Sequence, residues 1–167
     1  DESTIWSSPR KKTDVVAEPI KPYRGAEELE ALRFKTDRMK RKRPKVFMLN
    51  KKKKKMRRAR AQFSAGFFAS AGFEILDNIG FQSVDEGVQA VREKSPDIVV
   101  ICSSDQEYAD LAPAIYDRLN DLAIIVVAGY PKNSIEMLQE KGIQHFIHIK
   151  SNLVEYLKEF QRLLGIE

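Results

Sequence analysis

Short apolar runs rich in β-branched residues recur along the chain, and polar segments with helical periodicity separate them. The clearest run covers 97–102, and similar runs cover 45–50, 123–128 and 144–149, while 73–77 predicts one further strand. A strand that is apolar on both faces is typical of the centre of a parallel sheet that helices cover on both sides. The pattern therefore predicts five strands, with the run at 97–102 in the middle.

The segments after these runs predict helices over 56–71, 83–94, 108–119, 133–141 and 153–164. Ser83, with Glu86 three residues later, is a capping-box signature for the second of them. In the first, Ala59, Phe63 and Phe67 recur along one face at helical spacing. Regular alternation of strand and helix predicts an α/β fold, a flavodoxin-like doubly wound parallel sheet ordered 2-1-3-4-5.

Residues 1–44 have a different character from the rest and predict an extension or linker before an α/β domain at 45–167. The first part is polar and contains three prolines, so it predicts an extended lead-in. Good helix formers at 26–35 predict a short helix, whose Leu29 and Leu32 must dock on this domain or on a partner. A polar start without methionine suggests a piece of a longer protein.

Charge is distributed unevenly along the chain, whose net charge is +5. Residues 38–60 include 14 lysines and arginines and no acidic residue, while the remainder has 15 basic and 24 acidic residues. A basic block is thus attached to an acidic domain. The lysine run at 51–55 is open to three interpretations: a solvated loop, a site for an acidic partner or phosphate-bearing ligand, or a nucleic-acid contact. No aromatic residues are interleaved with it to stack on bases.

The sequence lacks the signals that mark several other classes of protein. The apolar runs are far shorter than a membrane span, no signal peptide is visible, and the one cysteine, Cys102, predicts a buried thiol, so we expect a cytoplasmic protein. His145 and His148 fall on opposite faces of a strand, which makes them poor joint metal ligands. The sequence has no cysteine and histidine cluster for zinc, and we predict no metal site.

In this fold class ligands bind beyond the carboxyl ends of the strands, so the loops after 50, 102 and 128 are the candidate binding site. Ser103 and Ser104 could donate to a ligand, or Ser104 or Asp105 could cap the next helix. Gly129 permits close backbone approach. Phosphoacceptor receiver domains share the fold, but they need acids where Asn50 and Cys102 stand.

Two segments carry a resemblance to a known family. Residues 57–68 and 71–75 resemble the carboxy-terminal, cobalamin-binding-like domain of the methylmalonyl-coenzyme A mutase small subunit. Residues 22–33 resemble the segment that leaves that family's substrate barrel. The likeness covers nearly the whole chain and implies a subunit of an isomerase with a cobalamin-binding fold.

The resemblance also implies that the cofactor site is degenerate. The broader family binds cobalamin through an Asp-x-His-x-x-Gly loop, whose positions fall on Lys54, Met56 and Ala59. In that family the histidine replaces the base below cobalt, the aspartate orients it, and the glycine lets the backbone close on the nucleotide tail. Met56 lacks the imidazole nitrogen, and Lys54 cannot accept the hydrogen bond that a ligating histidine donates.

Two further family motifs are altered. The family's Ser-x-Leu after the third strand falls on Cys102, Ser103 and Ser104, and its Gly-Gly after the fourth falls on Ala128 and Gly129. The resemblance therefore implies a non-catalytic, structural subunit that pairs with a large catalytic subunit. That partner would carry adenosylcobalamin and interconvert methylmalonyl-CoA and succinyl-CoA. The alternatives are a domain that still binds cobalamin and a basic nucleic-acid-binding module.

Interfaces with a partner are expected on apolar surface rather than on the lysine run. The sequence offers two candidates for that surface. One is the short helix at 26–35, and the other is the face opposite the carboxyl edge of the sheet.

Overall fold

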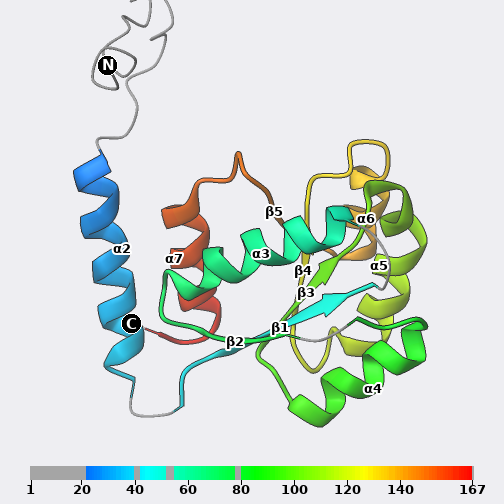
Figure 1. Ribbon diagram of the computed structural model, residues 1–167, viewed down its shortest axis with the longest axis horizontal. Helices are drawn as coiled ribbons and strands as arrows, with labels where there is room; N and C mark the ends of the chain where they lie inside the picture. The colour runs from blue at the N-terminus through cyan, green and yellow to red at the C-terminus, as the bar shows by residue number, and fades with distance from the viewer. Residues whose placement is uncertain (1–21, 40–41, 52–54, 78–79, 167) are drawn as a thin grey trace, which may run out of the picture.

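The computed structural model describes residues 22–39, 42–51, 55–77 and 80–166, and its helices and strands alternate along the chain (Figure 1). The elements are α2 (Pro22–Asp37), β1 (Lys45–Asn50), α3 (Lys55–Ala69), β2 (Glu74–Leu76), α4 (Val84–Lys94), β3 (Ile98–Cys102), α5 (Asp105–Leu119), β4 (Ile124–Ala128), α6 (Ile135–Lys141), β5 (His145–Ile147) and α7 (Leu153–Leu163).

The strands form one five-stranded parallel sheet in the order β2-β1-β3-β4-β5, which confirms the predicted topology. All five residues of β3 are buried at its centre. Some predicted bounds were wrong. Strand β5 ends at Ile147 because 148–151 form a turn in which the His148 N–H donates to Ser151 Oγ at 2.9 Å. Helix α5 begins at Asp105, before the predicted 108, because Ser104 already takes the extended N-cap conformation.

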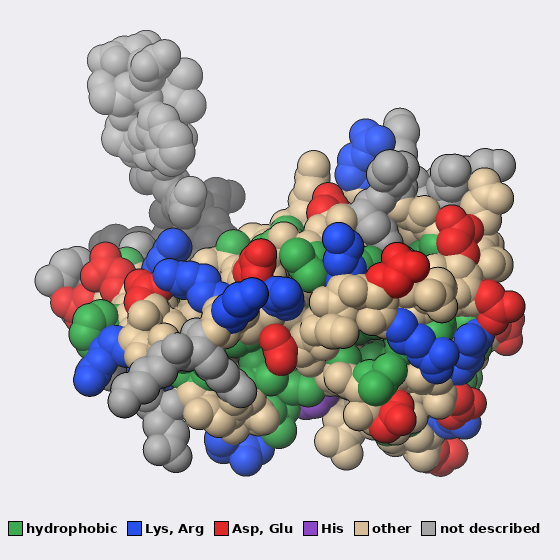
Figure 2. Space-filling view, turned by 90° about the horizontal axis from the view of Figure 1, so that it is seen from below, with side chains coloured by type: hydrophobic (Ala, Val, Ile, Leu, Met, Phe, Trp, Pro, Cys, Tyr) green, Lys and Arg blue, Asp and Glu red, His purple; other side chains and the backbone are tan. Residues whose placement is uncertain are grey.

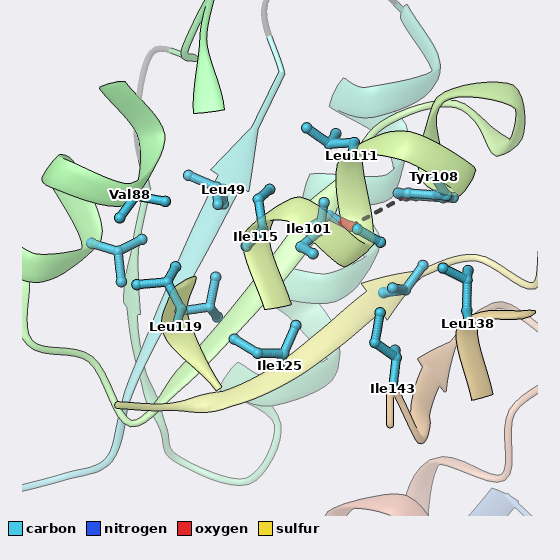
Figure 3. Close-up of a cluster of buried hydrophobic side chains, with 14 of the residues drawn as sticks. Leu49, Val88, Ile101, Tyr108, Leu111, Ile115, Leu119, Ile125, Leu138 and Ile143 are labelled. Atoms are coloured by element: carbon cyan, nitrogen blue, oxygen red, sulfur yellow. Dashed lines mark hydrogen bonds between the residues drawn. The ribbon is translucent and has the colours of Figure 1, made fainter. Parts of the chain in front are cut away.

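Each face of the sheet packs against its own helices (Figure 1). Helices α4, α5 and α6 cover one face, and Figure 3 shows their core, in which Leu49, Ile101 and Ile125 meet Ile115 and other helix residues. Helices α3 and α7 cover the other face with an aromatic core built from α3, α7 and the residues beside β2. Strands that are apolar on both faces are therefore required, as the sequence pattern indicated.

Two local predictions can be checked on the helices. The Ser83 cap is confirmed, since Ser83 Oγ accepts from the Glu86 N–H at 3.2 Å. The face predicted for the first helix is only partly right. Phe67 is buried in the core, but Ala59 is exposed and Phe68 is fully buried instead. The helix therefore turns a neighbouring face toward the sheet, and Ala59 and Phe63 are left at its edge.

Helix α2 packs against α7 (Figure 1). It is longer than the helix predicted at 26–35. Leu32 is buried in the contact, and the buried Gln161 of α7 donates through Nε2 to the Leu32 carbonyl at 2.7 Å and to Thr36 Oγ1 at 3.2 Å. A buried amide whose donors are satisfied fixes how the two helices meet. None of the described helices combines the length and the apolarity that a membrane span requires.

Candidate functional site

The junction between the carboxyl ends of β1 and β3 is the switch point of this topology, and hydrogen bonds continue across it. The Lys51 N–H donates to the Cys102 carbonyl at 3.3 Å, and the Phe81 N–H donates to the Asn50 carbonyl at 2.9 Å. Asn50 Nδ2 donates to Asp77 Oδ1 at 3.1 Å. The backbone ends that a ligand would meet at this junction, called here the β1–β3 junction, are therefore bonded to one another.

Side chains close the same junction from the α5 side. The Lys51 ammonium forms an ion pair with the Glu107 carboxylate, and Ser104 Oγ donates to Glu107 Oε1 at 3.1 Å. Ser104 occupies the N-cap position of α5, as predicted, but its side chain bonds to Glu107 rather than to a backbone N–H. The side chains of Asn50, Lys51 and Ser104 are thus engaged in contacts within the chain, whereas 52–54 of the lysine run lie outside the described residues.

Tyr108 closes the next gap, between β3 and β4. Its side chain is fully buried, and its hydroxyl accepts from the Ser103 N–H at 2.9 Å. The hydroxyl hydrogen faces the carbonyls of Ala128 at 2.5 Å and Ile101 at 3.2 Å, and Figure 3 shows the second of these contacts. Burial raises the pKa of the Tyr108 hydroxyl well above its usual range, so it stays protonated and keeps donating.

Arg60 reaches from α3 across the ends of β3 and β4. Its Nη1 donates to the Ser103 carbonyl at 2.6 Å, and its Nη2 donates to Asp105 Oδ1 at 2.7 Å. The guanidinium carbon lies 5.5 Å from the centre of the Tyr108 ring, a cation–π distance. Burial alone would lower the pKa of Arg60, but Tyr108 and the hydrogen-bonded Asp105 carboxylate outweigh it and raise that pKa.

Gly129 lies directly against this guanidinium. A Cβ added at Gly129 would meet Arg60 Cζ at 3.1 Å and both terminal nitrogens at 3.2 Å. Its φ of +133° also lies in a region that favours glycine. The glycine therefore serves a close approach, as predicted, but the group that approaches it in the described structure is a side chain of the same chain.

An open cavity of about 570 Å³ lies beside Arg60, between α3 and the turns after β4 and β5. We call it the β4–β5 cavity. Its lining residues are Ala59, Arg60, Phe63, Asp105, Ala128, Gly129, Tyr130, Lys132, Ile147, His148, Ile149 and Lys150. Among the described residues, no group of three or more His, Cys, Asp and Glu side chains is arranged to hold a metal ion.

The structure brings only some of the predicted site residues together. Ala59 and Gly129 line the β4–β5 cavity, whereas Ser103 and Ser104 are turned into internal contacts. Met56 falls in the first turn of α3, and Lys54 lies outside the described residues.

Sequence reasoning missed Arg60 and Tyr108, which do most to shape this edge. Arg60 directly follows the altered motif position Ala59, and its only signal was a basic residue on a helix that faces the sheet. Tyr108 was read as the start of a helix, and nothing local marks its hydroxyl as the partner of three backbone groups.

Side chains of both charges lie on the surface. On the face shown in Figure 2, acidic and basic side chains are interspersed, with hydrophobic side chains visible between them. A nucleic-acid-binding module presents a clustered basic patch or stripe. Residues 52–54 of the lysine run lie outside the described residues, and the nucleic-acid alternative stays a prediction.

Comparison with known proteins agrees with the sequence resemblance. No protein-family profile matches the chain. Over 149 residues, 89% of its length, the chain is 49% identical to the methylmalonyl-CoA mutase small subunit of Porphyromonas gingivalis. The chain is homologous to that mutase small subunit. It spans 24%, about a quarter, of the length of this relative.

A solved structure shares the fold of this chain. A cobalamin-binding protein from Desulfitobacterium hafniense DCB-2 superposes with a TM-score of 0.56, over 81% of this chain and 69% of that protein. The two sequences are 20% identical in the alignment. At that identity the likeness concerns the fold, and it supports the cobalamin-binding type of doubly wound sheet that was predicted.

Proposed function

We propose that this chain is part of a methylmalonyl-CoA mutase small subunit and that its cobalamin-binding fold serves assembly rather than cofactor binding. In this proposal a larger subunit carries adenosylcobalamin and interconverts methylmalonyl-CoA and succinyl-CoA. The high identity to a small subunit supports the assignment of the parent protein. The geometry at the carboxyl edge of the sheet supports the absence of cofactor binding.

The single observation that carries the proposal is the position of Arg60. Its guanidinium occupies the space against Gly129, at the motif where the resemblance would place the nucleotide tail of cobalamin. The backbone groups of Ser103 that could hydrogen-bond to that tail already have partners within the chain. The Ser103 N–H donates to Tyr108, and the Ser103 carbonyl accepts from Arg60. At position 56 the sequence provides a thioether in place of an imidazole. These residues do not fit cobalamin.

An absorbance titration tests the cofactor half of the proposal. Adding cobalamin to the chain through the micromolar range should leave the visible spectrum of the corrinoid unchanged. A Met56→His variant should behave in the same way, because the histidine alone leaves Arg60 in place. Saturable micromolar binding by the unmodified chain would overturn the proposal.

The assembly half needs the full-length parent, because the chain spans only about a quarter of its relative. A tagged full-length small subunit should purify together with the larger subunit. The cobalamin content of that complex should equal the amount of the larger subunit, not the sum of both. Cofactor in proportion to both subunits, or a small subunit that purifies alone, would contradict the proposal.

A further inference from the structure

We propose that a cavity at the amino edge of the sheet binds a small organic cation: a molecule with an apolar body and one ammonium or guanidinium group. The cavity, called here the amino-edge cavity, has a volume of about 430 Å³ and lies where β3, β4 and β5 begin. Small-molecule pockets span about 300–1,000 Å³. This inference does not depend on the proposed function, because it concerns the opposite edge of the sheet from the loops that carry the altered family motifs.

Two carboxylates line the cavity. Asp97 directly precedes β3 and Asp121 follows α5, and both are exposed. Asp97 Oδ2 accepts from the Lys45 N–H at 2.9 Å, which holds this carboxylate beside the strand. None of the described lining residues is a lysine or an arginine. Burial lowers the pKa of the lining residue His145 by more than the nearby Glu159 carboxylate raises it, so its ring is largely neutral at pH 7.

The ends of helices add to this negative potential. Asn120 is the C-cap of α5, Gly142 is the C-cap of α6, and Leu163 is the last residue of α7. All three line the cavity. The carbonyl groups at the carboxyl end of a helix carry a partial negative charge, equivalent to roughly half an elementary charge, and they stabilise a nearby cation. The cavity is therefore the place on this edge where carboxylates and helix ends favour the same sign of ligand charge.

Apolar groups form the other half of the site. Leu122 and Leu163 line the cavity with 55% and 42% of their surfaces exposed, and Ile124 is partly buried beside them in the lining. Tyr116 adds a partly buried aromatic ring, whose hydroxyl lies against Gly142 at the end of α6. A cation gains a further favourable contact where it lies over such a ring. The lining therefore selects a cation with an apolar body over a neutral molecule of the same shape.

An NMR titration with 2-phenylethylammonium tests the proposal, because this probe combines one flat ring with one ammonium group. The chain should bind it saturably at one site, with a Kd of about 1 mM or lower. Neutral 2-phenylethanol should bind at least about threefold more weakly, and the anion phenylacetate more weakly still. Binding that does not saturate, or a neutral alcohol that binds as tightly as the ammonium, would overturn the proposal.

The amide signals that shift in this titration locate the site. The largest changes should fall at 120–125, 142–145 and 163–164, which line the amino-edge cavity. Changes concentrated at the β4–β5 cavity would show that the probe is held at the other edge of the sheet, and the proposal would fail.

Substitutions that keep side-chain size remove the charge of the cavity. Asp97→Asn with Asp121→Asn should weaken ammonium binding about three- to tenfold at low salt and less at high salt, while 2-phenylethanol binding stays nearly unchanged. The asparagine at position 97 retains a side-chain oxygen that can accept from the Lys45 N–H, so the local backbone keeps its partner.

The matched control is Asp110→Asn with Glu136→Gln, which removes the same charge from exposed positions on α5 and α6 outside the cavity. The control pair should bind the ammonium with wild-type affinity. All four substitutions concern exposed side chains, so both pairs should fold. If the Asp97 and Asp121 pair binds no more weakly than the control pair, the carboxylates of the cavity do not hold the cation and the proposal fails.

A substitution at the rim tests the apolar half of the site. Leu122→Asn should weaken the ammonium and the alcohol alike, by about two- to threefold, because it removes apolar contact without changing charge. Unchanged affinity for both probes would mean that the ligand body does not contact this rim, which contradicts the proposed class of ligand.

Discussion

The β1–β3 junction and the β4–β5 cavity lie along the same edge of one sheet and differ in what fills them. At the junction, backbone groups bond to one another, and Lys51, Glu107 and Ser104 form a connected polar cluster. At the cavity, the turns after β4 and β5 stand away from α3 and leave an open space. The topology places the switch point at β1 and β3, yet the open site lies two strands away.

The difference teaches that the order of strands selects an edge and that individual side chains decide which gap along it stays open. Arg60 and Tyr108 mark the boundary between the two regions, since both bond to Ser103 at the end of β3. On the junction side of that boundary, the described side chains of Asn50, Lys51 and Ser104 form contacts within the chain. On the cavity side, apolar and cationic groups remain open to solvent.

Thiol accessibility should give the largest contrast between the two regions. Cys102 ends β3 at the junction and is fully buried, whereas Ile149 at the cavity is 83% exposed. We expect Cys102 to react with a thiol reagent roughly 100-fold or more slowly than a thiol introduced by Ile149→Cys in a Cys102→Ala background, because Cys102 must wait for the fold to open. Rates should converge in denaturant. Equal rates in buffer would mean that the junction is open to water.

The pKa of the Cys102 thiol predicts how the stability of the fold depends on pH. Burial, with a smaller contribution from Asp77, raises the pKa of Cys102 from 9.0 to about 12. Because the folded value is above the unfolded one, the stability from the neutral thiol is present below pH 9 and is lost as the pH rises toward 12. The Cys102→Ala variant should therefore lose less stability over that range than the wild type.

Removal of the Tyr108 hydroxyl should give the next largest effect, a loss in the free energy of unfolding. Tyr108→Phe leaves the Ser103 N–H and the Ala128 carbonyl buried without their partner, so we expect a loss of about 2–4 kcal/mol in the free energy of unfolding. Urea unfolding measures it. Tyr156→Phe on α7, at a partly buried position, is the control and should cost less than about 1 kcal/mol. Equal losses in the two variants would show that the Tyr108 hydroxyl does not hold the strand ends together.

The sequence predicted the sheet well because its signals are local and strong. The apolar runs and the cap at Ser83 are properties of a few neighbouring residues, and both are confirmed. The site was harder, because its shape depends on residues distant in sequence. Tyr108 meets Ala128 across 20 positions, and Arg60 meets Ser103 across 43. Periodicity marked Ala59 and Phe63 as a core face, whereas the helix rotation places both at the cavity.

Gly129→Ala should give the smallest of these effects on stability, and it tests the contact between Gly129 and Arg60. The added methyl would lie 3.1 Å from the Arg60 guanidinium carbon, and a φ of +133° strains any residue with a Cβ. We expect a loss of about 1–3 kcal/mol in the free energy of unfolding. Gly66→Ala is the matched control, because no atom lies within 4 Å of its added methyl, and in a helix interior it should stabilise by about 0.5–1 kcal/mol.

The two terms of the Gly129→Ala loss can be separated by combining it with Arg60→Met. The φ strain remains whatever side chain stands at position 60, whereas the contact with the guanidinium does not. If the contact matters, the double variant should lose less than the sum of the single losses. Additive losses would mean that Arg60 yields freely to the methyl, and that the guanidinium is held less firmly over Gly129 than its bonds to Ser103 and Asp105 indicate.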